Sequence, residues 1–201
     1  MKILAISCSP NKNGSTVLLL NKALEGAKAD GAEVELFSVA EKDIKPCDSC
    51  RACGKTGICI IKDSLEPIYD KMLAADGIIF GTPVYYYGMT AQAKIVMDRT
   101  HSFNQPGRSL ANKVAGVVAV AGSLGVEDAV KDFCFYFLAR RMIIANYLAA
   151  YSLGPGELQK MEKCMQAAYD LGKVMVTVAK SGFKYPVELM GRAIAYGTHT
   201  K

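Results

Sequence analysis

The sequence predicts an α/β fold in which a parallel five-stranded sheet carries helices on both faces. Short apolar runs of strand length alternate along the chain with segments whose apolar residues recur every three or four positions. This alternation is typical of βαβ units, which build a parallel sheet between two helical layers. No internal repeat, low-complexity tract or Pro/Gly/Ser-rich linker divides the chain, so we expect one domain over residues 1–201.

The first half of the chain predicts three strands and two helices. Residues 2–7 are a short apolar run, and residues 33–39 are a second run of strand length. Residues 15–29 place apolar side chains at helical spacing, and so do residues 65–75. Residues 77–81 (Gly-Ile-Ile-Phe-Gly) are an apolar run bounded by glycines, which favours a buried third strand.

The second half continues the alternation. Residues 90–100 are helical in pattern, and the valine-rich residues 113–121 predict the fourth strand. Residues 126–139 are again helical, and residues 142–149 predict the fifth strand. Residues 158–178 predict a long last helix, with one apolar side made of Leu158, Met161, Met165, Ala168, Leu171 and Met175. This order favours the doubly wound flavodoxin-like arrangement, in which ligands bind beyond the carboxyl ends of the strands.

Composition limits the class of function. The 24 basic and 19 acidic residues give a net charge of +5, but no Lys/Arg block alternates with aromatic residues, so nucleic acid is not an expected partner. The first apolar run is too short for a signal sequence or a transmembrane helix. We therefore expect a cytoplasmic protein without membrane association.

The loop after the first strand, residues 9–16, has the composition of a phosphate site. Its hydroxyls, glycine and backbone N–H groups precede a helix, whose dipole favours a bound anion. The spacing matches neither G-x-G-x-x-G nor a P-loop, so a dinucleotide or a nucleoside triphosphate is not the first expectation. An ordinary Asn/Gly/Ser turn with Ser15 as the helix N-cap would use the same residues.

The loops after the third and fourth strands add aromatic and amide groups. Tyr85, Tyr86 and Tyr87 are consecutive in a loop, so they cannot all point into the core. Gly122 and Ser123 follow the fourth strand. Each loop alone is also compatible with a simple turn. Together the three loops supply a phosphate anchor, an aromatic wall and an amide-rich floor, which suits a flavin.

Several motifs resemble those of the NADPH-dependent FMN reductase family over roughly the first two-thirds of the chain. They are Ser9-Pro10 with Ser15-Thr16, the Thr82-Pro83-Val84-Tyr85 loop, and Gln92-Ala93-Lys94 running to Met97-Asp98-Arg99. The resemblance implies that the FMN phosphate is held by Ser9, Asn11, Ser15 and Thr16. It also implies that the isoalloxazine ring is lined by Pro83, Val84 and Tyr85, with Gly122 and Ser123 on its other side. The family often has arginine after the Ser-Pro pair, so neutralisation of the phosphate here would rest on Lys12 and backbone amides.

Four of the seven cysteines are clustered. Cys47, Cys50, Cys53 and Cys59 give the pattern C-x2-C-x2-C-x5-C. In a reducing cytosol such a cluster indicates metal or redox chemistry before disulfides. The compact spacing fits one [4Fe–4S] cluster. The alternatives are a structural zinc, although zinc ribbons separate their C-x2-C pairs by longer stretches, and four free thiols.

The cysteine pattern resembles that of the iron–sulfur flavoproteins, a branch of the same superfamily with a compact cysteine motif between strand two and the next helix. That resemblance implies tetramers in which a cluster lies near a neighbour's flavin. Cluster-free relatives also carry several cysteines in this loop, commonly ending in Gly-x-Cys with an acidic residue soon after. Gly57-Ile58-Cys59 and Asp63 follow that second pattern here.

One predicted helix has too many apolar residues for a single buried face. Residues 133–138 (Phe-Cys-Phe-Tyr-Phe-Leu) would cover every side of it. We therefore expect a homo-oligomer, either a dimer or a tetramer, with this helix near an interface. Cys8, Cys134 and Cys164 are expected to be packing residues, and His101 a structural one.

These patterns predict an FMN-containing electron-transfer oxidoreductase that passes electrons between a [4Fe–4S] cluster and FMN to a small acceptor. The expected donor is a redox partner such as ferredoxin or NAD(P)H. No side chain stands out as a catalytic acid or base, because the chemistry belongs to the cofactors. The alternatives are a cluster-free NAD(P)H-dependent FMN or quinone reductase, and a zinc-stabilised binding protein that uses the tyrosine surface.

Overall fold

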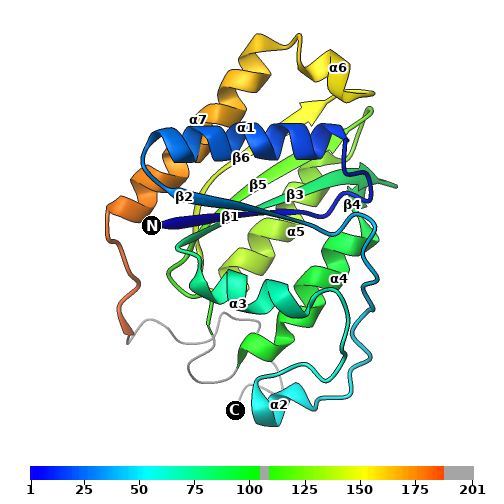
Figure 1. Ribbon diagram of the computed structural model, residues 1–201, viewed down its shortest axis with the longest axis vertical. Helices are drawn as coiled ribbons and strands as arrows, with labels where there is room; N and C mark the ends of the chain where they lie inside the picture. The colour runs from blue at the N-terminus through cyan, green and yellow to red at the C-terminus, as the bar shows by residue number, and fades with distance from the viewer. Residues whose placement is uncertain (105–108, 188–201) are drawn as a thin grey trace.

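The computed structural model describes residues 1–104 and 109–187, and a parallel sheet runs through its centre (Figure 1). The strands are β1 (Lys2–Ser7), β2 (Glu33–Ser38), β3 (Gly77–Tyr85), β4 (Gly88–Met89), β5 (Val114–Ala121) and β6 (Ile143–Tyr151). The parallel strands lie in the order β2-β1-β3-β5-β6, and β4 pairs antiparallel with β3. Counted without β4, this is the 2-1-3-4-5 order of flavodoxin-like folds, so the predicted fold class is confirmed.

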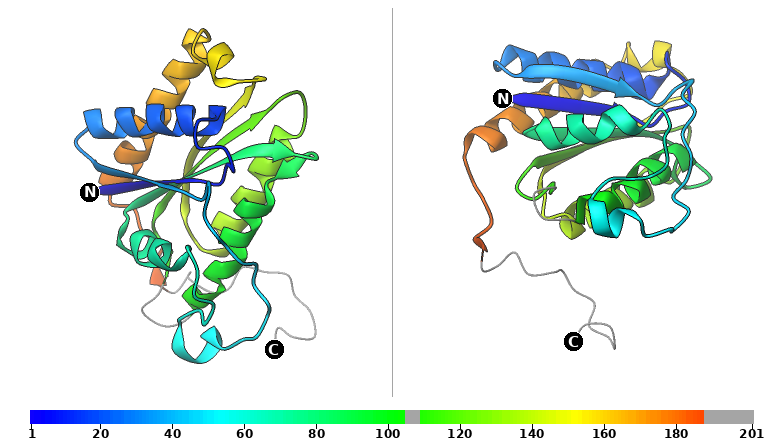
Figure 2. Two further views of the ribbon diagram at one scale, coloured as in Figure 1. Left: turned by 45° about the vertical axis from the view of Figure 1, so that its right-hand side comes forward. Right: turned by 60° about the horizontal axis from the view of Figure 1, so that its bottom comes forward.

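Helices cover both faces of the sheet (Figures 1 and 2). They are α1 (Ser15–Ala29), α2 (Cys53–Thr56), α3 (Glu66–Ala74), α4 (Ala91–Arg99), α5 (Val126–Ala139), α6 (Pro155–Leu158) and α7 (Glu162–Lys180), with a 3-10 helix η1 (Thr100–Asn104) after α4. Helices α1 and α7 lie on one face, and α3, α4 and α5 lie on the other. No helix in the described ranges is long and apolar enough to cross a membrane.

The central strands feed two separate cores, because successive residues of a strand face opposite sides of the sheet. Ile3 and Ala5 of β1 pack with α1 and α7, whereas Leu4 and Ile6 pack with the helices of the other face. Every residue of β5 is buried. Burial on both faces explains why these strands are continuous apolar runs in the sequence.

Two predicted elements differ from the structure. The third strand does not end at Gly81 but continues to Tyr85 and turns back into β4, so the expected tyrosine loop is the tip of a hairpin. The last predicted helix is divided, because the backbone of Met161 (φ −90°, ψ 76°) is not helical. Met161 is 44% exposed and does not belong to the buried side of α7.

Helix α5 has a buried side and an exposed apolar side. Phe133 and Phe137 are fully buried, and their rings pack against Phe80 with centroid distances of 5.2 and 5.7 Å. Phe135 and Leu138 remain 65% and 50% exposed. The prediction that the core cannot cover all of this helix is confirmed for these two residues.

Candidate functional site

The loops after the predicted strands one, three and four meet at the carboxyl edge of the sheet, because β1, β3 and β5 are neighbours. Two hydrogen bonds join the end of β1 to the chain around β3 and β4. The Cys8 N–H donates to the Gly81 carbonyl (2.8 Å), and Thr90 Oγ1 donates to the Cys8 carbonyl (2.9 Å). The predicted phosphate anchor and aromatic wall thus lie on one rigid edge.

The first turn of α1 is open to a ligand. Its N-cap is Gly14 in an extended conformation (φ −82°, ψ 171°), and glycine supplies no side-chain cap to the helix start. The alternative in which Ser15 is the N-cap is therefore wrong. An uncapped helix start leaves backbone N–H donors for water or a ligand, and the helix dipole favours negative charge there. This end of α1 fits the phosphate of FMN.

Ser9 and Asn11 shape the loop before the helix. Ser9 is buried, and its Oγ accepts a hydrogen bond from the Asn11 N–H (3.1 Å). Asn11 is exposed, and its Oδ1 accepts a hydrogen bond from the Asn13 N–H (2.9 Å). Both side-chain oxygens therefore stabilise the loop itself, and the amide nitrogen of Asn11 is the donor that a phosphate would use.

Lys12 is paired with an acidic residue. Its Nζ lies 2.8 Å from Glu41 Oε1, and the two side chains are 59% and 68% exposed. Solvent and salt screen an exposed pair of this kind, and the carboxylate offsets the charge of Lys12. Neutralisation of a phosphate would therefore depend more on the start of α1 than the sequence suggests.

Thr16 lies where α1 crosses the end of β3. Its side chain is buried, and a Cβ on Gly81 would be 2.9 Å from Thr16 Cγ2 and 2.5 Å from Leu20 Cδ1. Glycine at position 81 thus allows the helix to pack directly on the strand. Ser15, one residue earlier, is only partly buried and is the first residue of the helix.

The tyrosines are presented by a strained turn. Tyr86 and Tyr87 connect β3 to β4, and both have left-handed backbone conformations (φ 47° and 66°). Turns with this geometry normally carry Asn and Gly, because other residues are strained there. Tyr85, Tyr86 and Tyr87 are 52%, 101% and 62% exposed, so the predicted exposed aromatic surface is confirmed. Pro83 and Val84 precede it and are partly buried.

The loop after β5 packs against this hairpin. Gly125 has φ +90°, and a Cβ there would lie 2.6 Å from Tyr87 Cα, so the position accepts only glycine without rearrangement. Gly122 and Ser123 are exposed on the same loop. Leu153 was not identified from the sequence and is 85% exposed. It lies beside this loop, because a Cβ on Gly122 would be 3.4 Å from Leu153 Cδ2.

Two buried threonines connect the edge, and sequence reasoning gave neither of them a site role. Thr82 Oγ1 accepts a hydrogen bond from the Thr90 N–H (3.1 Å), and Thr90 Oγ1 accepts one from the Ala93 N–H (3.2 Å). Thr90 is thereby the N-cap of α4. A threonine directly before a helical pattern is the signal by which it could have been found.

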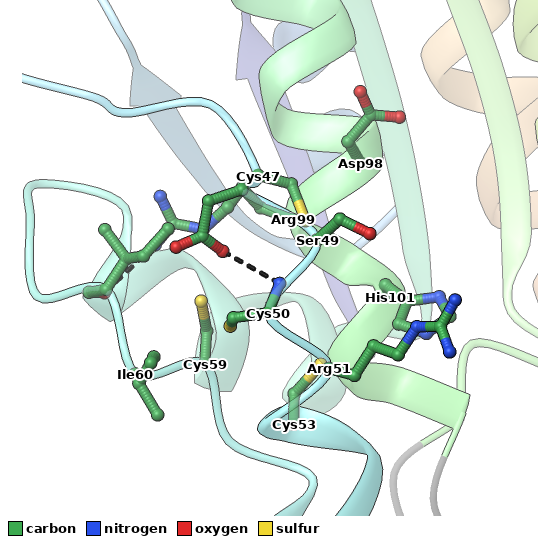
Figure 3. A pocket seen from close by; sticks show the side chains of 12 residues that line it. Cys47, Ser49, Cys50, Arg51, Cys53, Cys59, Ile60, Asp98, Arg99 and His101 are labelled. Carbon is green, nitrogen blue, oxygen red and sulfur yellow. Dashed lines mark hydrogen bonds between the residues drawn. The ribbon is translucent and has the colours of Figure 1, made fainter.

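The four clustered cysteines line one cavity of about 480 Å³ (Figure 3). Asp98, Arg99 and His101, at the carboxyl end of α4 and the start of η1, line the same cavity. Cys47 and Cys50 are exposed, whereas Cys53 and Cys59 are partly buried. Within residues 1–104 and 109–187, no three Cys, His, Asp or Glu side chains stand close enough to hold a metal ion. The donor set has the chemistry of a metal centre, and the segment has to contract to bind one.

The thiols are close enough to affect one another. Burial raises the pKa of Cys53, and the charges of Cys59, Cys47 and Cys50 raise that pKa further. Neighbouring thiolates repel, and a bound cation would remove this penalty because metals bind the deprotonated form. The surroundings of Cys53 are therefore unfavourable for an isolated thiolate.

The backbone around the first three cysteines is folded back. Ser49 and Arg51 both have φ 60°, a left-handed conformation that costs about 1–3 kcal/mol for residues other than glycine. Asp48 Oδ1 accepts a hydrogen bond from the Cys50 N–H (3.1 Å), the dashed line in Figure 3. The turns bring the cysteines to one cavity, where an extended chain would separate them.

A buried ion pair holds both ends of the cysteine segment, by which we mean residues 45–63. Arg99 Nη1 lies 2.7 Å from Asp63 Oδ2, and both side chains are fully buried. The same guanidinium donates to the carbonyl of Lys45 (2.7 Å), before the first cysteine, and to that of Ile61 (3.0 Å), after the last. One side chain of α4 therefore closes the base of the segment.

Asp63 is charged in this setting. Burial alone would raise its pKa, but hydrogen bonds from Arg99 and from the N–H groups of Lys45 and Leu65 outweigh burial and lower the pKa. Sequence reasoning noted Asp63 and Arg99 only as parts of family motifs. The partners are 36 residues apart in sequence, so no local pattern links them.

Comparison with known proteins identifies the family of this chain. Residues 1–152 match the family model of NADPH-dependent FMN reductases. The chain is 37% identical over 190 residues to an iron–sulfur flavoprotein of Methanocaldococcus jannaschii, covering 90% of this chain and 98% of that protein. It is 39% identical over 148 residues to an iron–sulfur flavoprotein of Methanosarcina thermophila, covering 73% of this chain and 78% of that protein.

A similar solved structure is that of a flavone reductase. It superposes with a TM-score of 0.71 at 27% sequence identity, covering 90% of this chain and 63% of that longer chain.

Proposed function

We propose that this chain, which belongs to the NADPH-dependent FMN reductase family and to its iron–sulfur flavoprotein branch, passes electrons between a [4Fe–4S] cluster and FMN to a small acceptor. Membership of this family makes the chain an FMN-dependent oxidoreductase; the cluster and the residues of both sites are the proposal. The observation that carries it is the single cavity lined by Cys47, Cys50, Cys53 and Cys59 on a segment held at both ends.

FMN would occupy the carboxyl edge of the sheet. The start of α1, without a side-chain cap, supports the phosphate there. The strained hairpin and the loop after β5 supply the surfaces for the ring. The residues proposed to hold FMN are Ser9, Asn11, Lys12, Ser15, Thr16, Pro83, Val84, Tyr85, Tyr86, Gly122 and Ser123.

The cluster would be held by the four thiolates of the cysteine segment. A bound [4Fe–4S] cluster takes up and releases single electrons, whereas FMN exchanges one or two. The protein holds both groups and sets their surroundings. No side chain is assigned as a general acid or base in this scheme.

The two sites lie at opposite ends of α4. Thr90 at its start bonds to the end of β1, while Asp98 and Arg99 at its end line the cysteine cavity. A nine-residue helix is about 14 Å long. The resemblance to iron–sulfur flavoproteins implies transfer between the cluster of one copy and the flavin of another, in a dimer or tetramer. The exposed Phe135 and Leu138 offer apolar surface for that contact.

The proposal is tested by single Cys→Ser substitutions at positions 47, 50, 53 and 59, with Cys134→Ser as the control. Each variant is reconstituted anaerobically, and iron, sulfide and FMN are measured. We expect loss of iron and sulfide in the four variants, with FMN retained in all of them and the control unchanged. Iron that persists in all four variants would show that these cysteines hold no cluster.

Two other results identify the alternatives. A wild-type chain without iron whose flavin bleaches rapidly with NADPH alone is a cluster-free NAD(P)H-dependent FMN or quinone reductase. Stoichiometric zinc in a colourless sample indicates the zinc-stabilised binding protein. If the cluster is present, ferredoxin-like donors are compared with NAD(P)H as sources of electrons.

A further inference from the structure

The guanidinium of Arg99 leaves one donor group unused. Nη1 donates to the Lys45 carbonyl and to Asp63 Oδ2, and Nη2 donates to the Ile61 carbonyl and to Asp63 Oδ1. These bonds engage the N–H groups of both terminal nitrogens. The Nε–H group is buried and has no hydrogen-bond partner in the part of the chain that the structure describes.

The hydroxyl of Tyr69 is a second buried donor that lacks a well-formed hydrogen bond. Tyr69 lies on α3, is 7% exposed, and packs edge-on against Phe103 with a centroid distance of 5.9 Å. Burial raises the pKa of Tyr69 to about 12, so the hydroxyl keeps its proton at neutral pH. Across the described residues its oxygen makes no hydrogen bond of good geometry either.

Both donors are neighbours of Cys59. Arg99 and Cys59 line the same cavity, and Cys59 packs against the core cluster that contains Tyr69. Arg99 acts on the Tyr69 hydroxyl through its charge and through a distorted hydrogen bond, both of which lower the pKa of Tyr69, and the charge of Cys59 raises that pKa. Buried donors in folded proteins nearly always make well-formed hydrogen bonds, so two donors without one at the same place indicate an acceptor that comes with a ligand.

Cys59 provides such an acceptor once it binds a metal. A metal-bound cysteine is a thiolate, and hydrogen bonds to a charged acceptor are stronger than those between neutral groups. Hydrogen bonds to the sulfurs are also among the factors that set the reduction potential of an iron–sulfur cluster. Arg99 would thus act on the metal centre as well as on the base of the segment.

We infer that Arg99 Nε–H and Tyr69 O–H are positioning donors that bond to the Cys59 sulfur in the metal-bound state. Both act through Cys59 and neither is a metal ligand. The inference rests on the proposed cluster, and it adds residues that the C-x2-C-x2-C-x5-C motif does not contain.

The experiment uses Tyr69→Phe in the full chain, with Tyr136→Phe as a matched control. Tyr136 also has a hydroxyl inside the protein, but that oxygen is already 2.9 Å from Thr100 Oγ1. Each protein is reconstituted anaerobically, and the midpoint potential of the cluster is measured by redox titration. The apoproteins are titrated with cobalt(II) alone and melted in parallel.

We expect Tyr69→Phe to shift the cluster potential to a more negative value and to weaken cobalt(II) binding several-fold. The melting temperature of its apoprotein should be unchanged or higher, because an unpaired buried hydroxyl is removed. Tyr136→Phe should leave the potential and the cobalt(II) affinity unchanged. Arg99→Lys, which keeps the charge but loses the Nε–H group, should shift the potential in the same direction as Tyr69→Phe.

Other outcomes overturn the inference. If Tyr69→Phe and the wild-type chain have the same cluster potential and the same cobalt(II) affinity, the hydroxyl does not reach the sulfur. Equal shifts in Tyr69→Phe and Tyr136→Phe would indicate a general effect of the core and contradict the assignment. A wild-type chain that takes up no iron and sulfide overturns the proposed function, and this inference with it.

Discussion

At the carboxyl edge of the sheet, many short contacts fix the loops, whereas one buried ion pair joins the two ends of the cysteine segment. The Thr82–Thr90 network, the Cys8 backbone bonds and the close approach of Gly125 to Tyr87 all act at the edge. The cysteine segment runs outside the helical layer, and Arg99 joins its two ends (Figures 1 and 2). The edge is therefore preformed, while the cysteine segment would have to contract around the proposed metal centre.

The difference has a physical reason. A flavin is a large rigid group whose phosphate and ring need fixed surfaces, and sheet edges supply them. A cluster brings its own geometry, and thiolates that are already gathered would repel one another. Among the described residues no three of these thiols lie close enough to hold a metal, which limits that repulsion until a metal binds.

Arg99→Met should have the largest effect. It leaves the buried Asp63 carboxylate without its partner, which costs about 3–5 kcal/mol of unfolding free energy. We expect faster hydrogen exchange across residues 45–63 and loss of iron, while bound FMN is retained. The control is Lys94→Met on the same helix, whose pair with Asp98 is exposed and contributes less than about 1 kcal/mol. Equal losses of iron and FMN would contradict separate anchoring.

Acid should release the cysteine segment through Asp63. Its pKa is lowered in the folded chain, so its contribution to stability is complete above the ordinary aspartate value of about 3.9 and is lost as the pH falls below it. In the apoprotein, hydrogen exchange at residues 45–63 should rise on acidification below that value. In Asp63→Asn, the amide hydrogens of residues 45–63 should exchange quickly at every pH. If their exchange still depends on pH in this variant, another group causes the effect.

Gly125→Ala tests the edge. A methyl group there meets Tyr87 Cα and requires a left-handed backbone, which together cost about 1–3 kcal/mol. We expect weaker FMN binding in an equilibrium titration, with iron content unchanged. Gly154→Ala is the control, because its φ is −175° and no atom lies within 4 Å of the added Cβ. Tight FMN binding in Gly125→Ala would show that the loop after β5 does not contact the flavin.

Lys12 should give the smallest effect. Its charge is exposed and shared with Glu41, so Lys12→Met is expected to weaken FMN binding by less than about tenfold. Glu41→Gln should strengthen binding slightly, because it releases the lysine charge. Both changes should fade at high salt, which a titration series at increasing ionic strength would reveal. A large loss of FMN affinity in Lys12→Met would show that this side chain, and not the helix start, makes the main contact with the phosphate.

The sequence was a good guide where local patterns carry the information. The apolar run of β5 and the Ser/Asn/Gly loop before α1 are adjacent residues with a recognisable spacing, so fold class and loop positions could be predicted. The extension of β3 could not, because the turn at Tyr86 and Tyr87 lacks the usual Asn and Gly. The pair of Arg99 with Asp63 depends on tertiary packing and has no local signature.

The central claim is that one chain holds FMN at the sheet edge and a [4Fe–4S] cluster on the cysteine segment. The most direct test measures FMN, iron and sulfide in one anaerobically purified and reconstituted sample of the wild-type chain. The account predicts about four iron and four sulfide for each FMN, the content of one cubane. FMN at full occupancy without iron or sulfide after reconstitution would contradict it.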